Sequence, residues 1–119
     1  MNDSKEMARL AYDAMDDKLA KDITIIDISG VSVVADYFLI ADGKNRNQVQ
    51  AIANNVDEFL GKAGYHAKAT EGYSTANWIL MDYSDVIIHI FSTEDRAFYD
   101  LERIWRDGKQ TDVDQIRNA

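Results

Sequence analysis

The chain has 119 residues, with 13 Lys and Arg against 21 Asp and Glu, so its formal charge is −8 with both histidines neutral. With 46% hydrophobic residues it can bury a real core, which excludes a disordered regulator, and the lack of cysteine excludes disulfides, thiolate nucleophiles and cysteine zinc sites. The longest apolar run, residues 37–41, is far short of the ~20 residues that cross a bilayer, and the first residues resemble neither a signal nor a transit peptide, so we expect a cytoplasmic protein and no membrane partner.

The acidic surplus also bears on the kind of partner. Binding to a nucleic acid backbone depends on Lys and Arg side chains that neutralise phosphates. A net charge of −8 suits a basic protein better. We therefore expect a protein partner and no direct sequence-specific nucleic acid binding.

The first half of the chain predicts one helix and two strands. Apolar residues recur at three- and four-residue steps over residues 3–19, which is typical of an amphipathic helix, and Asp3 with Glu6 offers a cap. Two β-branched runs follow at residues 23–28 and 33–41. Each run is closed by a turn pair, Ser-Gly or Asp-Gly, so both are predicted strands.

The second half predicts a helix, a weak strand, a β-hairpin and a last helix, over residues 47–62, 67–70, 77–91 and 92–108. Asn45 or Asn47 would cap the first of these helices. Residues 83–85 would form the hairpin turn.

The element order is therefore α-β-β-α-β-β-β-α. This order predicts an α/β (α+β) fold, with a mixed sheet of about five strands and helices that cover one or both faces. Residues 1–108 would form a single domain. Residues 109–119 are polar, and we expect a flexible tail there.

Carboxylates at strand ends raise the possibility of an enzyme. Asp27, Asp36, Asp82 and Asp85 could converge on Mg²⁺ for nucleotidyl or phosphoryl transfer. However, Asp commonly bonds backbone amides at strand ends and turns, and the sequence has no glycine-rich phosphate loop. The structural interpretation is favoured, and a metal-dependent transferase stays open as the alternative.

The two histidines, His66 and His89, are the other candidates for chemistry. His89 stands between Ile88 and Ile90 in an apolar strand, where an imidazole could act as a base or a ligand. Two histidines without cysteine make a poor metal set, so a hydrogen-bonded structural histidine is the favoured interpretation.

The strand after residue 77 carries a tryptophan whose environment decides its role. Strand alternation places Trp78, Leu80 and Asp82 on one face and the intervening residues on the other. If a helix covers the first face, Trp78 is core. If none does, the face is a partner site, which the neighbouring Tyr83 would enlarge. Sequence leaves both possibilities open.

Two long motifs now point to a family. Residues 78–91 read W-x-L-x-D-x-x-D-V-x-x-H-x-F, and residues 96–105 read R-x-F-Y-D-L-E-x-x-W. With smaller matches at residues 27–29, 36–40 and 71–72, the chain resembles the ribosomal silencing factor family, also called Iojap, over residues 5–106. It departs at residues 41–49, where members commonly show T-G-x-S-x-R-H-V, and it has Ser84 where a glycine is usual.

The resemblance implies a homodimer of nucleotidyltransferase-like fold that acts without catalysis, cofactor or metal. Such a protein binds a basic protein on the joining face of the large ribosomal subunit and blocks association with the small subunit when nutrients are scarce. The acidic side chains would ring an apolar patch if the hairpin and the preceding loop lie together. The expected partner-binding residues are Glu71, Trp78, Leu80, Asp82, Tyr83 and Asp85. A dimeric interaction module with another basic partner is a further alternative.

Overall fold

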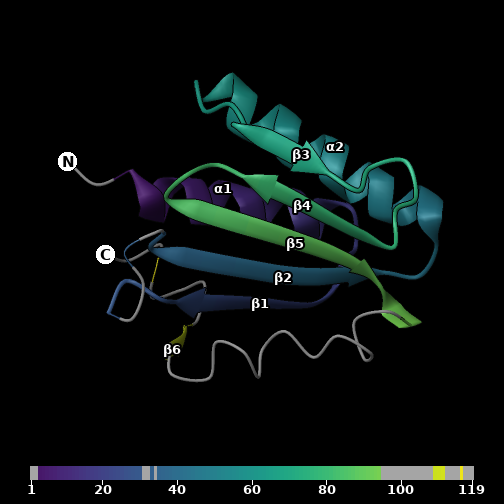
Figure 1. Cartoon of the computed structure of the whole chain (residues 1–119), viewed down its shortest axis with the longest axis horizontal. Helices are drawn as coiled ribbons and strands as arrows, with labels where there is room; N and C mark the ends of the chain where they lie inside the picture. Colours follow the sequence, from purple (N-terminus) through teal and green to yellow (C-terminus); the bar gives the residue numbers. More distant parts are fainter. Residues whose placement is uncertain (1–2, 31–32, 34, 95–108, 112–115, 117–119) are drawn as a thin grey trace.

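The computed structural model describes residues 3–30, 33, 35–94, 109–111 and 116. Within them, two helices cover one face of a six-stranded sheet (Figure 1). The elements are α1 (Ser4–Asp17), β1 (Lys21–Asp27), β2 (Tyr37–Gly43), α2 (Arg46–Lys62), β3 (Ala69–Glu71), β4 (Trp78–Asp82), β5 (Val86–Ser92) and β6 (Lys109–Thr111).

The sheet is mixed, and its strands lie in the order β3-β4-β5-β2-β1-β6. β2 and β5 run parallel, and every other neighbouring pair runs antiparallel. β4 and β5 form the predicted hairpin, with Trp78 opposite Phe91 and Leu80 opposite His89. The predicted mixed α+β fold is confirmed, with β6 as a short additional strand.

α1 packs a narrow stripe of small and flexible side chains against the rest of the domain. Its buried residues are Ser4, Met7, Ala8, Ala11, Ala14 and Met15. Alanines on this stripe let the helix pack closely on its neighbours. Asp3 stands at the N-cap position, but among the described residues its side chain makes no capping hydrogen bond, so the predicted cap is wrong in its chemistry.

α2 begins with a cap that also joins the two helices. The Asn45 side chain accepts a hydrogen bond from the Gln48 backbone N–H at 2.8 Å, which satisfies one of the free amides of the first turn. The Gln48 side chain donates to the backbone oxygens of Lys18 and Leu19, just after α1. Of the two caps that the sequence allowed, Asn45 and Asn47, the helix uses Asn45, although this segment departs from the family pattern.

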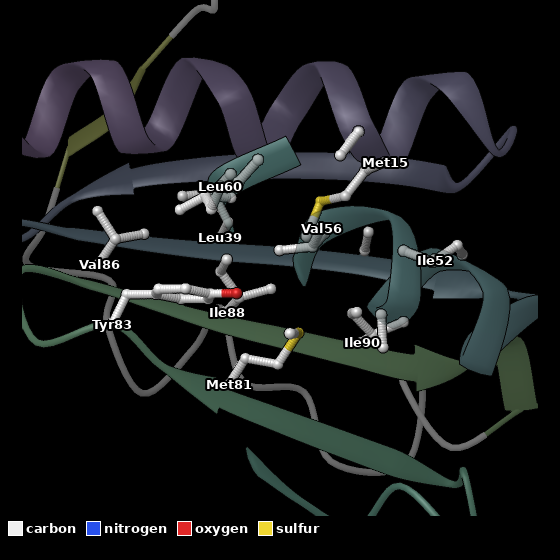
Figure 2. Packing of buried hydrophobic residues seen from close by; sticks show 14 of the residues in the cluster. Met15, Leu39, Ile52, Val56, Leu60, Met81, Tyr83, Val86, Ile88 and Ile90 are labelled. Carbon is white, nitrogen blue, oxygen red and sulfur yellow. The ribbon is translucent and has the colours of Figure 1, made fainter. Parts of the chain in front are cut away.

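Both faces of the sheet are apolar, and each has its own cluster. The helix-side core lies between the sheet and the two helices (Figure 2). Its members include Leu39, Ile52, Leu60, Ile79 and Ile88. The far-face cluster lies on the opposite face and consists of Ile26, Ile28, Ala35, Phe38, Ile40 and Phe91, with Trp78 and Ile87 packed against it.

The second predicted strand is displaced from its expected bounds. β2 begins at Tyr37 rather than at residue 33, and it ends at Gly43. The backbone N–H groups of Asp36 and Tyr37 both donate to the carbonyl of Asp85, where β5 is about to begin. Pairing with β5 therefore sets the start of β2, and the apolar sequence of residues 33–35 does not.

The C-terminal part of the chain differs from expectation at one described segment. Lys109–Thr111 pairs with β1 as β6, opposite Ile25–Asp27, a strand that the sequence did not predict within the polar tail. The helix predicted over residues 92–108 falls mainly on residues 95–108, which lie outside the described residues.

A candidate protein-binding face

β4 divides its side chains between the two faces of the sheet. Ile79 and Met81 are buried in the helix-side core, whereas Trp78, Leu80 and Asp82 are half-buried on the opposite face. The predicted alternation is confirmed. Of the two helices that the structure describes, neither α1 nor α2 covers the face on which Trp78 lies.

The short edge strand β3 adds an acid to this face. Glu71 lies directly opposite Leu80, and Ala69 lies opposite Asp82. Directly opposed residues in an antiparallel pair share a face, so Glu71, which is exposed, borders Leu80. We call Trp78, Leu80, Asp82 and Glu71 the β4 face. It combines an indole and an aliphatic side chain with two carboxylates.

A glycine lets the chain return from β3 to β4 at this place. Gly72 has φ +79°, a region that favours glycine, and a side chain there would run into the backbone oxygen of Trp78. The loop is further held by the Gly72 carbonyl, which accepts from the Ala76 N–H, and by Tyr73, whose hydroxyl accepts from the Asn54 side chain of α2. Glu71 and Trp78 are thus held near each other by the backbone.

Aromatic rings beside the β4 face, on the same side of the sheet, hold Trp78 from two directions. Its ring stacks on Phe91, with centroids 5.2 Å apart and planes 24° apart. Its indole Nε1–H donates to Nδ1 of His89 at 2.8 Å. His89 in turn contacts Phe38, with centroids 4.2 Å apart. These contacts extend the far-face cluster up to the β4 face.

His89 is the hydrogen-bonded structural histidine that the sequence favoured. Its side chain is 4% exposed. Burial disfavours the charged imidazolium and lowers the pKa of His89 from 6.5 to about 4. The ring is therefore neutral near pH 7, which is the form that can accept the indole proton at Nδ1.

Tyr83 does not join the β4 face, which corrects the expectation that it would enlarge the patch. It is 4% exposed and lies in the helix-side core, where Figure 2 shows its ring beside Ile88. Burial, together with the nearby Asp57 carboxylate, raises the pKa of Tyr83. The physical reason is alternation, since residue 83 continues the inward series of Ile79 and Met81.

The turn after Tyr83 exposes the last of the predicted site residues. Ser84 has φ 72°, the left-handed region that explains why a glycine suits this position. Asp85 is exposed, and its backbone oxygen accepts from the start of β2. Asp85 therefore lies at the end of the hairpin, beyond Asp82.

The four carboxylates of the enzyme alternative gather at one end of the sheet, and two of them make turn contacts. Asp27 Oδ1 accepts from the backbone N–H and the hydroxyl of Ser29, at 3.0 and 2.6 Å. Asp82 Oδ1 accepts from the backbone N–H of Ser84 at 2.8 Å. These bonds favour the structural interpretation. In the part of the chain that the structure describes, no three His, Asp or Glu side chains form a group that could hold a metal ion.

The described residues also contain no helix that is long and apolar enough to span a membrane.

The sequence did not predict that two residues, Gly72 and His89, contribute to the β4 face. The sequence signal for Gly72 is a glycine between a predicted strand and a polar loop. The signal for His89 is its place in the hairpin, but the predicted turn over residues 83–85 would set Leu80 opposite Ile88. The observed register sets Asp82 opposite Ile87 and Leu80 opposite His89, which brings Trp78 within reach of the imidazole.

Comparison with known proteins places this architecture in a family. A family model described as "Ribosomal silencing factor during starvation" matches residues 1–119. A Bacillus subtilis protein named "Ribosomal silencing factor RsfS" is 42% identical over 110 residues, which cover 92% of this chain and 93% of that protein.

Two crystal structures show the same fold. One is of a Bacillus halodurans protein, with a TM-score of 0.81 and 37% identity, covering 90% of this chain and 97% of the other. The other is of a Chromobacterium violaceum protein, with a TM-score of 0.85 and 32% identity, covering 94% and 92%. The fold and the sequence together define a small regulatory α+β protein. The chain belongs to the ribosomal silencing factor family, whose description concerns regulation at the ribosome, and the resemblance noted from the motifs is confirmed.

Proposed function

We propose that this protein represses translation in the cytoplasm by binding a basic protein on the joining face of the large ribosomal subunit, where it blocks association with the small subunit when nutrients are limiting. The observation that carries the proposal is the β4 face. In a chain that belongs to the ribosomal silencing factor family, this face presents Trp78 and Leu80 outside the helix-side core, with Glu71 and Asp82 beside them.

The composition of the β4 face supports a basic protein as its partner. Half-buried aromatic and aliphatic side chains can act as anchors, because truncating an interface tryptophan commonly costs ~2 kcal/mol or more of binding free energy. Carboxylates at the rim attract Lys and Arg side chains and raise the association rate. An apolar centre with acidic neighbours therefore suits a surface that combines apolar and basic side chains.

The net charge favours ribosomal protein over ribosomal RNA as the contact. At −8 the chain is repelled on average by RNA phosphates, so attraction to a particle made mostly of RNA depends on a local basic surface. A ribosomal protein rich in Lys and Arg supplies such a surface.

The resemblance also implies a homodimer, and we include it in the proposal. Sedimentation equilibrium over a range of protein concentrations tests this part independently of the ribosome. A monomer at every concentration would remove the homodimer from the account and leave the β4 face as the site of repression.

Sedimentation of cell lysate through a sucrose gradient tests the binding part. The protein should co-migrate with free large subunits and be missing from assembled ribosomes, because it and the small subunit would compete for one surface. Leu80→Ala should reduce co-migration. Leu19→Ala is the matched control, since Leu19 is 77% exposed just after α1 and away from the β4 face. Equal amounts of protein in both peaks would contradict the proposal.

A further inference from the structure

The tryptophan of the β4 face depends on a buried neighbour. We propose that His89 is a positioning residue that fixes the Trp78 indole in the orientation in which the partner meets it. This inference rests on the proposed function, in which Trp78 is the anchor. It assigns His89 a part in binding even though His89 itself, on the neighbouring strand β5, is buried.

The contacts on this pair leave the indole little rotational freedom. Trp78 Nε1–H donates to His89 Nδ1 at 2.8 Å, and the indole ring stacks on Phe91. The imidazole is restrained in its turn by the rings of Phe38 and Phe91, at centroid distances of 4.2 and 6.2 Å. The hydrogen bond and the stacked Phe91 ring, whose plane lies 24° from that of the indole, together restrict the tilt and the rotation of the indole.

The unsatisfied atom of His89 shows that packing alone does not explain a histidine here. Because Nδ1 accepts the indole proton, the neutral ring carries its own proton on Nε2. Among the described residues, Nε2 is buried and has no hydrogen-bond partner. Burying a polar atom without a partner is unfavourable, and a phenylalanine would fill the same space without that cost. What only the histidine provides is the acceptor for Trp78.

The internal hydrogen bond also defines what the partner contributes. The indole N–H is already satisfied within the chain, so the partner needs no acceptor for it. It meets the carbon surface of the ring, over which an Arg or Lys side chain can pack by cation–π attraction, with Glu71 as a nearby carboxylate. This is the chemistry of a basic partner that uses its cations as packing groups.

The test uses three substitutions of His89 and purified large ribosomal subunits as the probe. His89→Asn keeps an acceptor atom at the position of Nδ1, His89→Gln moves it outward by one carbon, and His89→Phe removes it while keeping a ring. The Kd should rise about fivefold for His89→Phe and His89→Gln, the loss expected for one neutral hydrogen bond, and should recover toward the original value for His89→Asn. The indole N–H of Trp78, identified in NMR spectra by its loss in Trp78→Phe, should exchange faster with solvent in the Phe and Gln variants only.

A double-mutant cycle separates positioning from a general effect on folding. Trp78→Phe keeps the stacked ring but has no N–H, so adding His89→Phe to it should change the Kd no further. If His89→Phe weakens binding equally with and without the indole N–H, its role is structural and the inference is wrong. If Trp78→Ala weakens binding but His89→Phe does not, the proposed function stands and the positioning role fails. If Trp78→Ala leaves the Kd unchanged, the β4 face is not the binding site and both fail.

Discussion

Replacing His89 by Asn should change how the stability of the protein depends on pH. In the folded chain, burial holds the pKa of His89 near 4, whereas the unfolded chain has the ordinary value of 6.5. Between these values the unfolded state binds more protons, so the free energy of unfolding falls as the pH falls. The contribution of neutral His89 to the free energy of unfolding is fully present above the pKa of the unfolded chain. About 3 kcal/mol of stability is lost once the pH lies below the pKa of the folded chain.

Part of this loss falls in a range where the carboxylates stay ionised. Between about pH 7.5 and about pH 5.5, the histidine alone should reduce the free energy of unfolding by about 1.3 kcal/mol. Urea unfolding at both pH values measures the difference. His89→Asn should lose this dependence, whereas His66→Gln, which removes the other and exposed imidazole, should keep it. An equal dependence in His89→Asn and in the unmodified protein would refute the burial of a neutral imidazole.

Three further predictions concern the β4 face. Leu80→Ala should speed dissociation from large subunits at least tenfold in surface plasmon resonance, with Leu19→Ala unchanged, because apolar anchors control dissociation. Glu71→Lys should slow association and reduce its dependence on salt in the same experiment. Asp16→Lys, which reverses another exposed carboxylate at the end of α1, should do less, and equal effects would make the acidic surplus a general property of the surface. Gly72→Ala should lower the free energy of unfolding by ~2 kcal/mol or more in urea titration, since φ +79° and the Trp78 carbonyl both exclude a side chain, and an unchanged value would contradict the loop geometry.

Local patterns predicted most of the fold because they are set by short-range chemistry. The three-residue and four-residue spacing of apolar residues located α1 and α2 to within a few positions. The residues after Trp78 alternate in a way that separates the two faces of β4, and the structure has that separation. What these patterns lack is information on pairing. β2 begins at Tyr37 because β5 begins opposite it, and β6 exists because β1 offers it an edge.

Strand alternation predicted which side chains of the candidate site share a face. The pairing of residues across the hairpin could not be predicted, because it depends on the register of the two strands. Tyr83 was misassigned because it is adjacent to the face in sequence, although the period of two already directs it inward with Met81. The bond from Trp78 to His89 depends on which residues of the hairpin stand opposite each other. Register is set by the turn and by burial together, so single residues considered in isolation do not reveal such a bond.

The rate and extent of subunit joining test the central claim most directly. Purified small and large subunits are mixed while light scattering is recorded, with the protein first bound to the large subunits at increasing concentrations. Joining should fall in proportion to the fraction of large subunits that carry the protein, and the variant with both Trp78→Ala and Leu80→Ala should restore it at equal concentration. Full joining by large subunits that demonstrably carry the protein would contradict the account.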